Sequence, residues 1–169
     1  MTLIPRRCFA ALSSLVVVVA VAIPATPAAS SSVRPAGAQK VISEYLSAHP
    51  GGVVINDNEI SYDGGRFIVT LTRPAHTRAA VADCPLGWFC FYDRTGYGYP
   101  RGRLSDCGRQ NLATWGWQLR VESAHYNLSS GSVAFLYSGS RLFSVGAAAR
   151  ALGDVAPYRN WATHVDRYC

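Results

Sequence analysis

The chain is poor in charged residues, and those it has form no runs of one sign. Charged residues make up 15% of the 169 residues, and the only lysine among the sixteen basic residues is Lys40. Nucleic-acid binding proteins usually carry clustered basic residues, whereas the arginines here are scattered. We therefore expect a solvated surface and no nucleic-acid partner, although the net charge of +6 could attract acidic polymers.

Long apolar runs are missing after residue 23. Residues 1–38 combine a basic start, an apolar run over 9–23 and then small residues and prolines, which is the layout of a secretory signal. The run is shorter than the roughly 20 residues that a membrane span needs. The sequence thus predicts a secreted, extracellular protein without a membrane anchor. We expect a signal peptide over 1–28, with cleavage after Ala38 as the alternative to cleavage after Ala28.

Patterns typical of catalytic sites are also missing. Gly131-Ser132 and Gly139-Ser140 lack the flanking glycines of a nucleophile elbow. No paired spacing that would raise the pKa of one carboxyl group occurs among the acids of the second part, which are Asp93, Asp106, Glu122, Asp154 and Asp166. We expect no enzyme activity and no cofactor.

Cysteines are few, and one of the five is lost with the signal because Cys8 precedes the apolar run. In an exported chain the remaining four indicate disulfides, for which three pairings are possible. These cysteines are Cys84, Cys90, Cys107 and Cys169. A zinc site would need cysteines or histidines in two close pairs, but His125 and His164 stand alone, so no metal site is expected.

Residues 39–72 read as a small α+β leading segment. Apolar residues at helical spacing predict a helix over 39–48, which the breaker His49-Pro50-Gly51-Gly52 ends. Strand-like runs follow at 52–55, 59–62 and 66–71. Residues 73–83 have no periodicity and read as a linker. Arg73 and Arg78 are alternative processing sites within it.

From Cys84 onward the pattern changes to short strands separated by turns. Fifteen of the nineteen aromatic residues lie here, which is typical of an all-β domain over 84–169. We expect about eight strands, including 88–92, 103–105, 119–126, 133–137, 141–145 and 163–168, with a helical turn over 147–152. All four tryptophans, Trp88, Trp115, Trp117 and Trp161, are expected in the core, since large aromatics of a small β domain are mostly buried.

Two halves of similar layout, 84–127 and 132–169, suggest paired Greek keys. The first half carries Cys84-Pro-x-Gly-x-Phe-Cys90-x-Tyr92, then Tyr97-Gly98 and Asn111-Leu112. On these residues the sequence resembles the secreted microbial proteins of peptidase inhibitor family 36, the Streptomyces metalloproteinase inhibitor type. The resemblance implies a βγ-crystallin-like Greek-key sandwich over 84–169. One departure is Tyr99, which stands where the crystallin hairpin has a glycine.

The resemblance implies the pairing Cys84 with Cys90 and Cys107 with Cys169, of which the longer loop contributes about 4 kcal/mol in the chain-entropy model. It also implies a monomeric inhibitor that blocks an extracellular metallopeptidase with a rigid, disulfide-supported loop. The inhibitory residues are unknown, because no second short cysteine pair follows residue 130. Two exposed candidates are the hairpin Arg94–Arg103 and the loop Ser138–Arg141.

The alternative function is an extracellular βγ-crystallin-like binding module for cell-wall carbohydrate or calcium, without inhibition. Positions that match crystallin calcium ligands are Gln118, Leu119, Glu122 and Ser123 in the first half, and Asn160 and Thr163 in the second. A third hypothesis is that residues 39–83 form a leader that keeps the domain inactive, or assists its folding, until it is removed.

Overall fold

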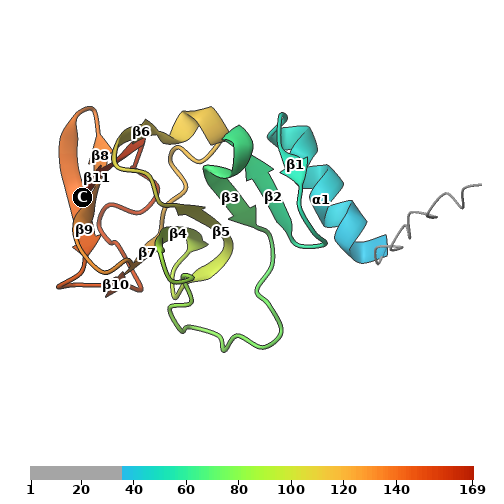
Figure 1. Ribbon diagram of the computed structural model, residues 1–169, viewed down its shortest axis with the longest axis horizontal. Coiled ribbons are helices and arrows are strands. Elements are labelled where there is room, and N and C mark those ends of the chain that lie inside the picture. Colours follow the sequence, from blue (N-terminus) through green and yellow to red (C-terminus); the bar gives the residue numbers. More distant parts are fainter. Residues whose placement is uncertain (1–35) are drawn as a thin grey trace, which may run out of the picture. The chain divides into compact units, whose positions relative to one another are not determined.

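Two antiparallel sheets and one α-helix make up the part of the chain that the computed structural model describes, residues 36–169 (Figure 1). The second part, residues 84–169, contains antiparallel strands and no α-helix, which confirms the all-β expectation. The predicted signal peptide over 1–28 lies outside the described residues. The helix in residues 36–169 is too short and too polar to cross a membrane.

The leading segment begins with α1 (Ala36–Ala48), three residues before the predicted start. Three strands follow, with a short 3₁₀ turn, η1 (Asp63–Gly65), between the second and the third. They are β1 (Val53–Val54), β2 (Glu59–Tyr62) and β3 (Phe67–Thr70). The residues of the predicted linker carry no helix or strand. Strand β3 nevertheless pairs with the second strand of the following part, at Arg101–Arg103, so the sheet continues across the predicted boundary.

Seven strands form the larger sheet, in the order β1-β2-β3-β5-β4-β7-β10. Its members after the leading segment are β4 (Trp88–Arg94), β5 (Gly98–Leu104), β7 (Ser123–Asn127) and β10 (Ala151–Leu152). The smaller sheet has the order β6-β11-β8-β9. It consists of β6 (Gly108–Asn111), β8 (Ser132–Tyr137), β9 (Ser140–Gly146) and β11 (His164–Tyr168), and a 3₁₀ turn, η2 (Leu112–Trp115), follows β6.

The two halves of the second part exchange one strand each. Strand β6 of the first half joins the sheet of the second half, and β10 of the second half joins the sheet of the first. Each half therefore adds three strands to one sheet and one strand to the other. Neither half can complete its own sheet, which makes the two halves interdependent.

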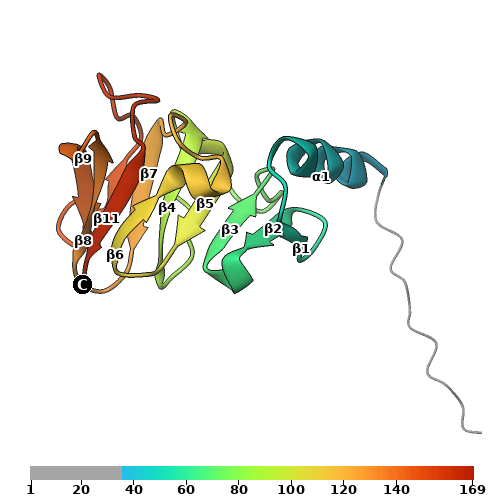
Figure 2. The same cartoon turned by 90° about the horizontal axis from the view of Figure 1, so that it is seen from above.

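Figure 2 shows β3 of the leading segment beside β5 of the second part. One hydrophobic core combines side chains of both sheets with side chains of the leading segment. Phe91 of β4 meets Phe135 of β8 edge-on, with ring centroids 6.0 Å apart. Phe67 of β3 stacks on Phe91 at the same distance. A Cβ at Gly102 would lie 2.6 Å from Phe91 and 2.8 Å from Phe67, so only glycine fits there. Each fully buried aromatic or aliphatic side chain contributes about 1.5 to 3 kcal/mol.

Two predictions of local structure were wrong, and one strand was missed. The helical turn over 147–152 is instead a bend that leads into β10, because Ala151 and Leu152 pair with His125 and Ala124. Strand β6 was not predicted, since the polar sequence of 108–111 has no strand pattern and is held by pairing with β11. The strand expected over 119–126 begins only at Ser123, because Leu119 has a left-handed backbone conformation.

Candidate functional site

The four tryptophans do not share one environment. Trp115 and Trp117 are buried as expected, and Trp88 is half-buried beneath the Arg103 guanidinium, 5.1 Å from its ring centroid. Trp161 is 52% exposed, so the prediction that it belongs to the core is wrong. It follows the turn after β10, where the backbone carries its indole to the surface. A large exposed aromatic side chain is a common feature of binding surfaces.

Trp161 belongs to a group of neighbouring side chains that we call the aromatic surface, comprising the exposed Leu119, Tyr137, Asn160 and Trp161 and the half-buried Tyr158. Tyr137 is 44% exposed and Leu119 is 48% exposed. The ring of Trp161 lies 6.1 Å from that of Tyr137 and 6.4 Å from that of Tyr158. Leu119, Tyr137, Asn160 and Trp161 line a hollow of about 330 Å³. This volume fits one bulky side chain or one sugar ring.

The backbone beneath the aromatic surface adopts uncommon conformations. Leu119, Ser138 and Asn160 have φ values of 57°, 48° and 60°. This left-handed region disfavours side chains with a Cβ, most strongly bulky ones such as leucine. Conformations of this kind gather at functional sites, where surrounding bonds hold them in place. Here they turn Leu119 outward.

Hydrogen bonds to buried backbone carbonyls hold the conformations at Leu119 and Asn160. The Leu119 N–H donates to the Ala162 carbonyl at 2.8 Å, and the Asn160 N–H donates to the Val121 carbonyl at 3.0 Å. The Asn160 side-chain amide donates to Glu122 Oε1 at 2.9 Å. Ala162 and Val121 are fully buried. The aromatic surface therefore presents exposed side chains on a braced backbone.

An ion pair borders the aromatic surface. Asp154 accepts hydrogen bonds from the Arg159 guanidinium and from the Ala156 N–H. The hydrogen bond from Arg159, followed by that from Ala156, lowers the pKa of Asp154 to about 2. The carboxylate thus stays ionised at neutral pH and keeps the turn over 154–159 closed.

The two candidate loops differ in exposure. The turn Ser138–Arg141 is exposed throughout and directly follows Tyr137. In the hairpin Arg94–Arg103 only Arg94 and Thr95 are exposed. Its tip is tied down, because the Thr95 N–H donates to Glu122 Oε2 and the Gly96 N–H to the Gly153 carbonyl. The hairpin is therefore not a free loop, and the turn is the stronger candidate.

The four cysteines form the two expected bridges. Cys84 and Cys90 are joined with Cα atoms 5.5 Å apart, and Cys107 and Cys169 with Cα atoms 5.9 Å apart. The first bridge is buried on the outer face of the larger sheet, and the second ties the end of β11 to the start of β6. Such bridges fit an oxidising environment.

Three of the positions matched to calcium ligands, Glu122, Ser123 and Asn160, already make hydrogen bonds within the protein. Glu122 Oε1 accepts from Asn160, and Ser123 Oγ donates to the Arg94 carbonyl at 2.7 Å. Their oxygen atoms thus already join the hairpin tip to the aromatic surface. Among the described residues, no group of three or more histidines, cysteines and acids is placed to hold a metal ion.

A buried polar cluster around Asp83 escaped the sequence analysis. Its carboxylate accepts from the hydroxyls of Tyr92 at 2.8 Å and Tyr99 at 2.6 Å. Arg101 and Arg73 lie 3.4 Å and 3.5 Å from the same carboxylate. Burial, together with the negative charge of Asp83, raises the pKa of both tyrosines, so they stay protonated as donors. The cluster fastens the end of the predicted linker to the sheet.

A second polar cluster joins α1 to the larger sheet. Arg120 donates to both carboxylate oxygens of Asp93, at 2.9 Å and 3.0 Å, and lies 3.2 Å from the His49 Nε2. Tyr45 accepts from the Trp117 indole at 2.8 Å. Burial first, and then the charge of Arg120, lower the pKa of His49. Asp93 is held at both oxygens, so the cluster suits a structural brace rather than proton transfer.

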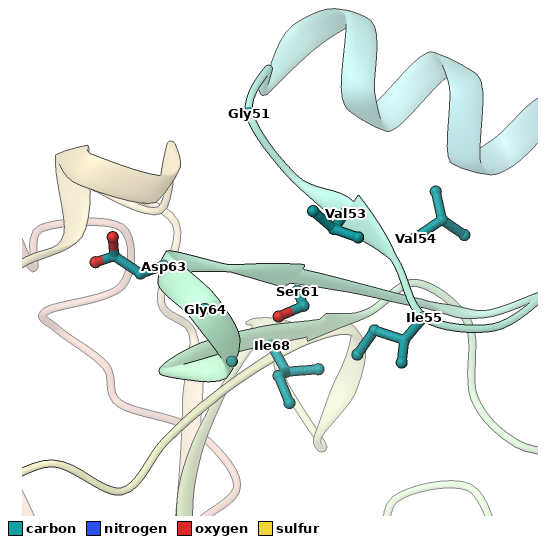
Figure 3. Close-up of a pocket in the computed structure, with 9 residues that line it drawn as sticks. Gly51, Val53, Val54, Ile55, Ser61, Asp63, Gly64 and Ile68 are labelled. Carbon is teal, nitrogen blue, oxygen red and sulfur yellow. The ribbon is translucent and has the colours of Figure 1, made fainter.

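A larger hollow of about 590 Å³ lies on the leading segment (Figure 3). Val53, Ser61 and Ile68 are cross-strand neighbours and line it. The Asp63 carboxylate points away from these side chains in Figure 3. A lining that offers little beyond one hydroxyl has few groups to orient a ligand, which makes the aromatic surface the stronger candidate.

Comparison of the chain with protein-family models, with curated proteins and with solved structures found no match. Trp161 and Leu119 could not have been found as site residues by periodicity, because their exposure comes from the left-handed backbone at positions 119 and 160. The one local signal was the Gly/Ser turn at 138–140.

Proposed function

We propose that the protein is a secreted peptidase-inhibitor-like protein that blocks an extracellular metallopeptidase with the aromatic surface and the adjoining turn Ser138–Arg141. The observation that carries the proposal is the exposure of Trp161, Tyr137 and Leu119 on a backbone that buried hydrogen bonds hold in place. These three side chains would fit a peptidase cleft that contains an apolar pocket.

The strand order supports a βγ-crystallin-like Greek-key fold for residues 84–169. In that reading each half is one key and exchanges a strand with the other, as β6 and β10 do. The two disulfides and the signal-like start of the sequence support secretion, since bridges persist in oxidising compartments.

Rigidity is the physical reason why such a surface would inhibit. Ordering a flexible loop on binding costs about 0.5 to 1.5 kcal/mol for each immobilised side chain with many rotamers. In the free protein, strand pairing closes the turn Ser138–Arg141, and hydrogen bonds hold the backbone at Leu119 and Asn160. Tryptophan and tyrosine are also the residues that most often dominate binding energy in protein interfaces.

The test is an inhibition assay with a thermolysin-like metallopeptidase, with serine and cysteine peptidases in parallel. We expect inhibition of the metallopeptidase, and we expect Trp161→Ala to weaken it by about 30-fold or more, as for a binding hot spot. The control is Leu86→Ala, which removes another exposed side chain, 83% exposed, in the connection before β4. It should leave inhibition unchanged.

Two results would contradict the proposal. One is the absence of inhibition against all three peptidase classes. The other is full inhibition by the Trp161→Ala protein, provided that its free energy of unfolding stays within about 1 kcal/mol of the parent, as expected for an exposed position.

A second candidate function is binding of cell-wall carbohydrate. Aromatic rings stack on the apolar faces of sugars, and the Asn160 amide lies beside the rings of Trp161 and Tyr137 in a hollow of about 330 Å³. Retention on peptidoglycan or chitin that is lost in Trp161→Ala would favour this function. Calorimetric titration with calcium tests the remaining crystallin-like ligand.

A further inference from the structure

The connection between β3 and β4 is the longest irregular stretch in residues 36–169, covering 71–87. Its middle is open to solvent: Ala75, His76 and every residue from Arg78 to Val81 are exposed. Two local hydrogen bonds involve this middle part, from the Thr77 N–H to the Pro74 carbonyl and from Arg73 Nη1 to the Arg78 carbonyl. An exposed, irregular stretch is where proteases cut folded proteins.

Both ends of this connection are firmly held. Arg73 donates to the Tyr97 carbonyl and lies 5.0 Å above the Tyr99 ring, besides its ion pair with Asp83. Asp83 is fixed by two tyrosine hydroxyls, and the Cys84–Cys90 bridge follows at once. A cut between Arg73 and Asp83 would therefore leave both new ends close to the body of the protein.

Arg78 is the residue in this stretch that an arginine-specific protease can recognise. Its side chain is exposed, and the residues after it are small, Ala79 and Ala80. The other arginine, Arg73, precedes Pro74, whose ring replaces the backbone N–H and fixes φ, so its peptide bond is a poor substrate. Several other exposed basic residues lie in helices or strands, as Lys40 in α1, Arg94 in β4 and Arg141 in β9 do. Three more lie outside helices and strands, where their side chains are held by hydrogen bonds: Arg66 to Asp106, Arg150 to the Leu128 carbonyl and Arg159 to Asp154.

Within residues 36–169, no covalent bond other than the main chain joins the two sides of Arg78. All cysteines of the described residues lie at or after Cys84, and the two bridges stay within that part. A cut after Arg78 would therefore separate two polypeptides that only non-covalent contacts hold together.

These contacts are extensive. Strand β3 pairs with β5 at Ile68, Val69 and Thr70. Polar contacts across the boundary join Arg101 to Thr70 at 3.0 Å, Arg103 to Glu59 at 3.1 Å and Arg66 to Asp106 at 2.6 Å. The leading segment also contributes fully or nearly fully buried side chains to the shared core, namely Ile42, Ile60, Phe67, Val69 and Leu71.

We propose that Ala75–Val81 is a cleavage site for an arginine-specific serine protease, and that the cut after Arg78 yields a two-chain protein. Water adds across the Arg78–Ala79 peptide bond, which gives a carboxylate on Arg78 and an ammonium group on Ala79. The segment that ends at Arg78 remains docked through β3 and the shared core. It becomes a removable subunit that covers the edge of β5 and the ring of Phe91.

The experiment is limited digestion of the purified exported chain with trypsin, followed by intact-mass analysis and gel filtration. We expect the first products to be a fragment ending at Arg78 and a fragment beginning at Ala79. These should separate on a denaturing gel without reducing agent but elute together at the parent volume under native conditions. Arg78→Gln should slow the loss of the intact chain by about tenfold, since later cuts require local opening.

The matched control is Arg94→Gln, which removes an exposed arginine at the end of a paired strand and should be cut at the parent rate. A first cut elsewhere, or equal digestion of the Arg78→Gln protein, would overturn the site. Elution of the fragments as separate species would overturn the two-chain form. The readout does not use a metallopeptidase, so its failure is distinct from failure of the proposed inhibition.

Discussion

At the scale of single residues, Trp117 and Trp161 show that distant contacts and the local backbone decide whether a tryptophan is buried. Trp117 is fully buried because its indole N–H donates to the Tyr45 hydroxyl and Arg120 lies 4.8 Å above its ring. Trp161 has the same intrinsic hydrophobicity but follows Asn160, whose left-handed backbone directs the chain outward. Trp117 is thus buried beside a hydrogen-bond partner that lies 72 residues away in the sequence.

Two histidines should make stability depend on pH. His125 Nδ1 accepts from the Cys84 N–H at 3.0 Å, which requires a neutral ring, and burial lowers its pKa as it does that of His49. The unfolded chain, with histidine pKa values near 6.5, therefore binds protons first on acidification. We expect the free energy of unfolding to fall as the pH drops from about 7 through 6.5 towards the lower folded pKa values.

Urea unfolding at several pH values between about 7.5 and 5.5 measures this effect. The double variant His49→Gln, His125→Asn should show a flatter dependence in that window. Stability that rises on acidification, or an unchanged slope in the double variant, would refute the prediction. The free energies of unfolding at the alkaline end of this range serve as the reference, because the rings of His49 and His125 are neutral there in both the folded and the unfolded protein.

At the scale of elements, the short turn of the β8–β9 hairpin fixes the position of Tyr137 in the aromatic surface. Tyr137 and Ser140 are paired, and the two residues between them, Ser138 and Gly139, both have positive φ, which is the pattern of a type I′ turn. This turn matches the twist of the strands, so it holds Tyr137 at a fixed place beside Trp161.

Substitution of Gly139 should reveal this backbone requirement. A Cβ at Gly139 would meet no atom within 4 Å, so any cost comes from its φ of 82° alone. We expect Gly139→Val to lower the free energy of unfolding by about 1 to 3 kcal/mol, whereas Gly139→Asn, which tolerates this region, should cost clearly less. Chemical denaturation measures both, and equal losses would argue against the turn type.

At the scale of the whole molecule, strand exchange and the two bridges hold distant parts of the chain together. Strand β11 lies between β6 and β8, and Cys169 at its end is bonded to Cys107. The leading segment is joined to the rest by the main chain, sheet pairing, core contacts and polar contacts, and the two bridges lie outside it. The described residues thus combine a cross-linked part with a part that is not cross-linked.

The two bridges should differ in their contribution to stability. The Cys107–Cys169 bridge spans 62 residues and the Cys84–Cys90 bridge only 6. In the chain-entropy model, replacing the first pair by alanine costs about 4 kcal/mol and replacing the second about 2 kcal/mol. Unfolding of the two double variants in urea would measure the difference. A larger loss from the shorter bridge would show that buried packing around Cys90 outweighs loop closure.

The sequence predicted the elements with strong local signals well. The helix before His49, the strand at 59–62 and the β-branched run at Phe67–Thr70 are all present, because their apolar spacing and flanking breakers act locally. Strands β6 and β10 were missed because two to four residues without a pattern become strands only when a partner strand is in place.

By itself, the amino-acid sequence determined the all-β class of the second part and the short helix of the leading segment, because hydrophobic periodicity and turn residues act over a few positions. Only the tertiary structure decided that the leading segment shares the core, that Trp161 is exposed and Trp117 buried, and that Asp83 collects two tyrosines. These features depend on contacts between residues far apart in the chain, and no local pattern encodes such contacts.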